Sequence, residues 1–230
     1  MSLQTFKKER EMGLNEKEFE KGFYQRNPPG SAEKLKTKKV GVAGAGGLGS
    51  NIAAALVRSG IRDLVIADFD TIEISNLNRQ QFFHDQIGRV KVEALKENLL
   101  KINPFLRIDA LCEMVDADNA AGIFGDCDIL IEAFDRAAAK VMLAEAWMKS
   151  FPEKYIVIGS GLAGYGMNGA IKTTVHDKLV ICGDQTTESS PENGLLAPRV
   201  LIVAAMQANA AVEILLNGKI SSRTNSKENI

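Results

Sequence analysis

The feature that most constrains the fold is a glycine-rich loop between an apolar run and a predicted helix. The loop reads G-A-G-G-L-G-S over residues 44–50 and follows the apolar run 39–43. This strand-to-helix context is the one in which G-x-G-x-x-G indicates nucleotide binding. Glycines let backbone amides approach a phosphate or ribose, and the helix N-terminus adds partial positive charge. The alternative is that Gly46 and Gly49 only allow close helix packing. We favour nucleotide binding, with Gly44, Gly46, Gly47 and Gly49 as the candidate glycines.

The rest of the chain continues the alternation of strands and helices. This alternation predicts an α/β fold with a Rossmann-like, mostly parallel sheet flanked by helices. After the strand at 155–159, glycines and β-branched residues predict added antiparallel strands at 171–175 and 179–182, on the C-terminal side. The other predicted strands are 39–43, 64–67, 106–112 and 129–132, and the predicted helices are 47–59, 91–102, 117–124, 135–149 and 199–216.

Three regions are expected along the chain. Residues 1–33 are expected to be an N-terminal helical extension, because 2–21 is amphipathic and the two prolines at 28 and 29 end any helix. Residues 34–218 are expected to be the main nucleotide-binding domain, and 219–230 a disordered tail. Within the main domain, the polar segment 184–198 is long enough to be a functional crossover loop or a mobile segment.

Composition excludes several classes of function. The charged fraction is 25% and the formal net charge is −1, so the chain lacks the basic excess of a nucleic-acid binder. The apolar run 200–216 contains polar residues and no signal peptide is visible, so we expect a cytoplasmic protein without membrane contact. Three cysteines without a C-x-x-C pair argue against a disulfide framework and a structural zinc site.

Two carboxylates follow the second predicted strand. Asp68 ends that strand about twenty residues beyond the glycines, where a carboxylate can accept hydrogen bonds from ribose hydroxyls. Asp70 is a second candidate in the same loop. The alternative is that both are solvated carboxylates in a loop, and for Asp70 alone that alternative is at least as good. Up to this point an NAD-dependent enzyme fits as well.

The next polar segment favours a triphosphate over a dinucleotide. Arg79 can hold anionic oxygens with its planar fork and Asn76 can donate to a phosphate oxygen. Lys91 can bring a second cation, although a lysine at a helix start is often only solvated. Asp135 follows the strand 129–132 and can hold Mg²⁺ on phosphate oxygens. A helix N-cap is an equally good role for Asp135.

These residues give the chain a specific family resemblance. The motifs G-A-G-G-L-G-S, A-D-F-D, S-N-L-N-R-Q, Lys91 with I-N-P at 102–104, and F-D-R at 134–136 occur in this order. Together they resemble the ubiquitin-activating-enzyme-like adenylyltransferases of the HesA/MoeB/ThiF group, over residues 39–218. The shorter thiamine-biosynthesis members of the ThiF type are the most similar subgroup.

The resemblance implies an ATP-dependent reaction. ATP would lie along the glycine loop with Asp68 at the ribose, and Asn76, Arg79 and Lys91 around the phosphates. Asp135 would hold Mg²⁺. The reaction would adenylylate the C-terminal glycine carboxylate of a small ubiquitin-like sulfur carrier, ThiS-like and ending in Gly-Gly, and release pyrophosphate.

The resemblance also implies a homodimer and an arginine finger. The family's N-terminal R-Y-x-R-Q pattern is partly retained in F-Y-Q-R-N at 23–27, which makes Arg26 the candidate residue to reach ATP across a dimer interface. Its alternative role is that of a solvated surface arginine. The spacing from Arg26 to the glycine loop is shorter than usual in the family.

The cysteines depart from the family pattern. Many relatives carry zinc-binding C-x-x-C pairs and some carry a loop cysteine, whereas here Ser190 stands near that loop position and Cys182 stands alone at a strand end. We therefore expect the enzyme to stop at the adenylate, without zinc. The competing hypotheses are an NAD(P)-dependent oxidoreductase, and a non-catalytic scaffold that binds nucleotide or carrier.

Overall fold

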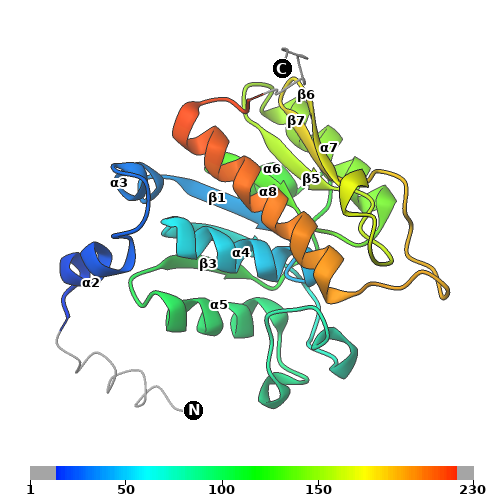
Figure 1. Cartoon of the computed structure of the whole chain (residues 1–230), viewed down its shortest axis with the longest axis horizontal. Coiled ribbons are helices and arrows are strands. Elements are labelled where there is room, and N and C mark those ends of the chain that lie inside the picture. Colours follow the sequence, from blue (N-terminus) through cyan, green and yellow to red (C-terminus); the bar gives the residue numbers. More distant parts are fainter. Residues whose placement is uncertain (1–13, 222–230) are drawn as a thin grey trace, which may run out of the picture.

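Seven strands form one sheet in the order β3-β2-β1-β4-β5-β7-β6 in the computed structural model, which describes residues 14–221 (Figure 1). Strands β1 to β5 and β7 run parallel, and β6 pairs antiparallel with β7. The predicted α/β sheet is therefore confirmed, with β6 as the strand that opposes the others. The strands are β1 Lys39–Ala43, β2 Asp63–Ala67, β3 Arg107–Leu111, β4 Ile129–Glu132, β5 Ile156–Gly159, β6 Lys172–His176 and β7 Leu179–Gly183.

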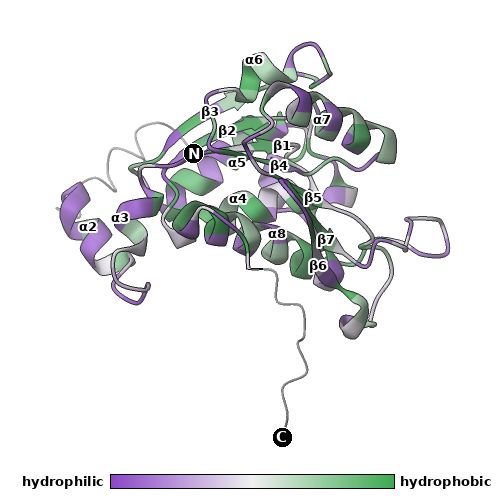
Figure 2. Cartoon of the chain, turned by 90° about the horizontal axis from the view of Figure 1, so that it is seen from above, coloured by the Kyte–Doolittle hydropathy of each residue, from purple (hydrophilic) through white to green (hydrophobic). Residues whose placement is uncertain are grey.

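Helices cover both faces of the sheet. Seen from above in Figure 2, α4, α5 and α8 lie on one face and α6 and α7 on the other. The helices of the sheet are α4 Gly47–Ser59, α5 Lys91–Ile102, α6 Ala120–Phe124, α7 Ala137–Ser150 and α8 Ala197–Asn217; α2 Glu16–Phe23 and α3 Ser31–Leu35 precede them, and the 3₁₀ helices are η2 Ile74–Asn76, η3 His84–Gln86 and η4 Asn168–Ala170.

The strands separate two apolar cores by the alternation of their side chains. Val40 and Val42 of β1 point into the core under α4, α5 and α8. Gly41 faces the other side, where a Cβ would lie 2.8 Å from a ring carbon of Phe124 in α6. Leu130 belongs to that second core, together with Trp147 of α7. Period-two alternation on a sheet buried on both faces produces these near-continuous apolar strands.

Three predicted helix boundaries differ from the observed ones. The helix predicted at 117–124 begins at residue 120, because the Asp116 carboxylate accepts the amides of Asp118 and Asn119 and holds them in a turn. The helix predicted at 135–149 begins at Ala137. The helix predicted at 199–216 is α8, which begins at Ala197 with a proline in its first turn, so the crossover loop shortens to 184–196.

Helix α8 packs inside the domain. By length and composition it is the one helix among residues 14–221 that could cross a membrane, with half of its most apolar window buried. It packs against α4, β5 and β7. Gln207 in its middle is fully buried and donates from Nε2 to the carbonyl of Glu132 at 2.8 Å. Burial of that polar group with a partner is typical of a core helix in a globular domain.

The N-terminal segment packs on the far end of α4. Tyr24 donates to the carbonyl of Val57 at 3.3 Å, and Leu35 of α3 is 1% exposed. The predicted boundary at residue 33 falls inside helix α3. The division of the chain into an N-terminal extension and a main domain remains a prediction. The first part of the helix predicted at 2–21 lies outside the described residues, as does the predicted tail 219–230 beyond Ser221.

Candidate nucleotide site

The candidate site lies where the order of the strands reverses. From β1 the chain passes through α4 to β2 and β3 on one side, and it returns through α6 to β4 on the other side of β1. The loops after β1 and β4 therefore leave in opposite directions, which creates the crevice used for ligands in open α/β sheets. A Cβ built on Gly44 would lie 2.8 Å from the carbonyl oxygen of Ala133, so the two loops meet.

The glycine loop has both a packing role and an open surface. Gly44 has a φ of 104°, a conformation that favours glycine, and a Cβ on Gly49 would lie 1.9 Å from the Gly44 carbonyl oxygen. A Cβ on Gly46 would meet only Gln80, at 3.8 Å. Gly46 is also the N-cap of α4, and no side chain caps the helix there. The first amides of α4 thus face an open position suited to an anion.

Asp68 fixes the path of the glycine loop. Its Oδ2 accepts the amide of Ala45 at 2.7 Å and its Oδ1 accepts the amide of Asp70 at 2.8 Å. Each carboxylate oxygen keeps a further lone pair for a ribose hydroxyl. The reading of Asp68 as a merely solvated carboxylate is therefore wrong, while its contact with ribose stays a prediction.

Lys91 is buried and paired. Its side chain is 8% exposed, and Nζ lies 2.7 Å from Oδ2 of Asp70, whose side chain is 49% exposed. The backbone amide of Lys91 also donates to the Asp70 carbonyl at 3.0 Å. Burial excludes the interpretation of Lys91 as a solvated residue at a helix start. Asp70 holds the ammonium group at the end of β2.

Asn76 and Arg79 lie on a loop tied to the start of α4. Asn76 is buried, and its Oδ1 accepts the amide of Glu73 at 3.0 Å. Arg79 donates from Nη1 to the Ser75 carbonyl at 3.0 Å, and its stem would contact a Cβ on Gly47 at 3.6 Å. The Arg79 side chain therefore runs beside the first turn of α4, where a phosphate group would sit.

Loop and helix are also joined through Asn51 of α4. Its Nδ2 donates to the carbonyl of Arg79 at 2.9 Å, and its Oδ1 accepts Nε2 of Gln81 at 2.6 Å. The hydrogen bond from Asn51 to the Arg79 carbonyl fixes the backbone from which the Arg79 side chain extends. Asn51 lies one turn beyond the glycines, and no motif in the sequence marks it.

Asp135 is exposed next to the glycine loop and does not cap α7. The N-cap of α7 is Arg136, without a capping side-chain hydrogen bond. The turn that bears Asp135 begins at Ala133, whose amide donates to the Ala43 carbonyl at 2.8 Å. The alternative N-cap role is therefore wrong. Among residues 14–221, no three His, Cys, Asp or Glu side chains gather into a metal site, so Mg²⁺ at Asp135 would take its other ligands from phosphate and water.

Arg26 lies far from the glycine loop of its own chain. Its neighbour Asn27 donates to the carbonyl of Ser59 at 2.9 Å, at the C-terminal end of α4. The glycine loop adjoins Gly47, at the other end of this 13-residue helix. At 1.5 Å per residue the separation is roughly 18 Å. Arg26 is exposed, and it does not join the site within one chain.

Two further features of the site were not found from the sequence. Gln80 is 9% exposed next to Gly46, and its Oε1 has no hydrogen-bond partner among the described residues. Its place directly after Arg79 was the available signal. Glu132, at the end of β4, is fully buried and paired with Lys140. Burial holds the pKa of Glu132 above its usual range although Lys140 lowers it. The apolar sequence at the end of β4 contains no pattern that indicates the pair of Glu132 with Lys140.

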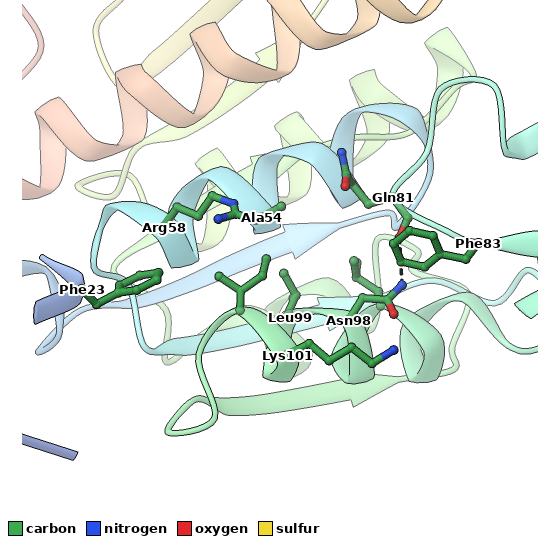
Figure 3. A pocket seen from close by; sticks show the side chains of 10 residues that line it. Phe23, Ala54, Arg58, Gln81, Phe83, Asn98, Leu99 and Lys101 are labelled. Atoms are coloured by element: carbon green, nitrogen blue, oxygen red, sulfur yellow. Dashed lines mark hydrogen bonds between the residues drawn. The ribbon is translucent and has the colours of Figure 1, made fainter. Parts of the chain in front are cut away.

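A groove beside α4 does not coincide with the glycine loop. It has a volume of about 410 Å³ and lies between α4 and α5, with Phe23 at one end and Phe83 at the other (Figure 3). Arg58 and Lys101 project at its edges in the same view. The candidate nucleotide site is therefore assigned from the backbone and side chains around the first turn of α4, because that turn is an open surface.

Two of the three cysteines, Cys127 and Cys182, are buried. Burial raises the pKa of Cys182, at the end of β7, to about 11, and that of Cys127 to about 12. Such thiols stay protonated at neutral pH and are poor nucleophiles. The hydroxyl of Ser190, in the crossover loop, donates to a carboxylate oxygen of Glu192 at 3.0 Å. Its partner is therefore not a general base of the histidine type.

A buried ion pair anchors the start of the crossover loop. Arg199 of α8 contacts Asp184, and its Nη1 donates to the Gly166 carbonyl at 3.1 Å. Burial raises the pKa of Asp184, but hydrogen bonds from Thr187 and Thr186 outweigh it and bring that pKa to about 2. The pair connects the loops that follow β5 and β7.

Known proteins resemble this chain over most of its length. The molybdopterin-synthase adenylyltransferase of Escherichia coli K12 is 28% identical over 192 residues, which are 80% of this chain and 75% of that protein. The sulfur carrier protein ThiS adenylyltransferase of Bacillus subtilis is 31% identical over 81% of this chain and 57% of its own length. Several fungal and insect relatives are more than twice as long as the part matched.

Solved structures and the family profile agree with the sequence relatives. The structure of Escherichia coli tRNA N6-threonylcarbamoyladenosine dehydratase, in complex with ATP, superimposes with a TM-score of 0.78 at 19% identity, over 89% of this chain and 97% of that one. This likeness establishes the fold. The profile described as ThiF family matches residues 22–229. The family resemblance noted in the sequence is therefore confirmed: the chain belongs to the ThiF family.

Proposed function

We propose that this chain adenylylates the C-terminal carboxylate of a small ubiquitin-like sulfur carrier with ATP. The observation that carries the proposal is the open first turn of α4, flanked by the Arg79 stem and fixed by Asp68. An uncapped helix N-terminus with a glycine at the N-cap suits a phosphate chain. The relatives named as adenylyltransferases support the same reaction class.

The residues divide the work of binding between them. Gly44, Gly46, Gly47 and Gly49 shape the loop along the phosphates, and Asp68 accepts the ribose hydroxyls. Arg79 and Lys91 offset the charge of the phosphates and Asn76 donates a hydrogen bond to a phosphate oxygen, while the ion pair between Asp70 and Lys91 weakens. Mg²⁺, at Asp135, would neutralise charge on the phosphate oxygens.

The chemical step is an in-line displacement at the α-phosphorus. A carboxylate oxygen of the carrier's terminal glycine forms a bond to that phosphorus, and the bond to the oxygen bridging to the β-phosphate breaks. The acyl-adenylate and pyrophosphate are the products. The protein supplies no covalent group, so its contribution is positioning and the neutralisation of charge on the leaving pyrophosphate.

The reaction is proposed to end at the adenylate, in the cytoplasm and without zinc. Support for ending at the adenylate comes from the raised pKa of Cys182 and from its complete burial. A thioester would need a thiolate that the carrier can reach. We infer that another protein transfers the sulfur, and that the carrier is ThiS-like and serves thiamine biosynthesis.

We further propose a homodimer in which Arg26 of one copy reaches the ATP of the other. Arg26 cannot reach its own glycine loop along the length of α4. Exposed apolar side chains lie on the segment after β2, at Ile74, Phe83 and Ile87, as expected for a surface that a second copy covers.

Co-expression of Arg26→Ala and Lys91→Ala chains tests this dimer, because only mixed dimers hold one intact site. About a quarter of wild-type activity is expected for random pairing, and no recovery would contradict it.

The central experiment is pyrophosphate exchange into ATP. Exchange is expected with a ThiS-like carrier ending in Gly-Gly, and none with the same carrier lacking the two glycines. Asp135→Ala is expected to lower the exchange rate at least 100-fold. The same exchange assay with the substrate of molybdopterin-synthase adenylyltransferases is the matched comparison for carrier specificity. If ATP binds but no carrier supports exchange, the non-catalytic scaffold hypothesis replaces the proposed function.

A further inference from the structure

The turn that bears Asp135 is held by a buried ion pair. Both carboxylate oxygens of Glu132 contact Nζ of Lys140, at 2.9 and 3.1 Å. The Glu132 side chain is fully buried and that of Lys140 is 15% exposed. Oε1 of Glu132 also accepts the amide of Phe134 at 2.5 Å. One carboxylate thus connects the end of β4, the turn after it and the first turns of α7.

The backbone around this turn is fixed on both sides of the strand end. The amide of Ala133 donates to the carbonyl of Ala43 at 2.8 Å, and the carbonyl of Glu132 accepts Nε2 of Gln207 at 2.8 Å. With Phe134 bound to Glu132, the two residues before Asp135 each have a fixed amide. Asp135 follows these two residues and is exposed.

A buried ion pair needs a reason other than stability. Removing two charges from water costs about as much as their attraction returns, and replacing such pairs with apolar residues of similar volume is often neutral. This pair stands at the point where the strand order reverses, beside the candidate site. Its clearest structural effect is on the position of the turn 133–136.

We propose that Glu132 is a positioning residue that holds Asp135 in place for Mg²⁺ bound to the phosphates of ATP, with Lys140 as the countercharge that allows the Glu132 carboxylate to be buried. This inference rests on the proposed function for the presence of ATP and Mg²⁺. Groups that orient a metal ligand commonly change metal affinity 10- to 100-fold when removed. The contribution is therefore to the Mg²⁺ dependence of nucleotide binding.

The test compares two double variants that differ in one acceptor. Glu132→Met with Lys140→Met removes both charges and the acceptor for the Phe134 amide. Glu132→Gln with Lys140→Met removes the charges but keeps an amide oxygen at the same place. Binding of a non-hydrolysable ATP analogue is measured by calorimetry at several Mg²⁺ concentrations, and thermal unfolding is measured alongside.

The first double variant is expected to need about 10-fold more Mg²⁺ for half-maximal binding, and the second less than about 2-fold more. In an Asp135→Ala background, both pairs of substitutions are expected to change binding less than 2-fold, because they act through Asp135. Equal losses in both double variants, or undiminished losses without Asp135, would overturn the proposal.

A measurement on the wild-type chain keeps the proposal testable if the first variant does not fold. The Phe134 amide is expected to exchange with deuterium at least 100-fold more slowly than an unstructured amide, before any nucleotide is added. Rapid exchange would refute the positioning role. If the wild-type chain binds the analogue without any Mg²⁺ dependence, the positioning role is wrong while ATP binding stands. If it binds no analogue at all, the proposed function fails as well.

Discussion

Substitution of Gly49 by alanine should damage the site through packing alone. A Cβ at this position would lie 1.9 Å from the Gly44 carbonyl oxygen and 2.8 Å from the Gly44 carbonyl carbon, and real Cβ contacts essentially never fall below 3.0 Å. Because the nearest atoms are backbone, no side chain can rotate away. The start of α4 and the glycine loop must separate by about 1.1 Å, the difference between 3.0 and 1.9 Å.

The expected magnitude follows from two opposing effects. Overpacking of this kind costs about 1 to 3 kcal/mol of the free energy of unfolding. Alanine in place of glycine in a helix returns up to about 1 kcal/mol. We expect a net loss of about 1 to 2 kcal/mol, together with weaker ATP binding at the displaced loop and a loss of activity of about 100-fold, the usual effect of a displacement of roughly 1 Å.

The assay uses the single tryptophan as a reporter. Trp147 is fully buried in α7, so its fluorescence follows chemical denaturation, while calorimetry measures ATP binding. Gly122→Ala in α6 is the matched control, because a Cβ there meets nothing within 4 Å, and it should leave both quantities unchanged or raise stability slightly. A Gly49→Ala chain with wild-type stability and ATP affinity would refute the packing argument.

Two other predictions concern acid stability and thiol reactivity. The pKa of Asp184 is about 2, below the ordinary 3.8, so its stabilising contribution of about 2 kcal/mol is complete above pH 4 and is lost as the pH falls towards 2. Denaturation at several pH values should show this slope. Asp184→Asn should reduce the slope and cost about 3 kcal/mol at pH 7 because Arg199 loses its partner, whereas an unchanged slope would contradict the assignment. In thiol labelling at pH 8, exposed Cys112 should react within minutes and buried Cys127 and Cys182 at least 100-fold more slowly until denaturant is added. Rapid labelling of Cys182 in the native protein would reopen the possibility of a thiol step.

The sequence by itself determined the succession of strands and helices along the chain and the place of the glycine loop. Apolar runs such as Lys39–Ala43 and Ile129–Glu132 match the observed strands, because fully buried parallel strands are continuous in hydrophobicity. Helices begin less predictably: Asp135 looked like a cap, yet α7 begins two residues later. Local side-chain hydrogen bonds decide such ends, and the sequence contains several equally good candidates for them.

Only the tertiary structure decided how the candidate site residues relate to one another. Lys91 is paired with Asp70 across 21 positions of the sequence, and Asp68 holds the glycine loop across 23. Arg26 lies at the far end of α4, and the Glu132–Lys140 pair is hidden at the end of an apolar strand. These relations depend on where the strand order reverses between β1 and β4. That reversal is a property of sheet topology, which residue spacing along the chain does not contain.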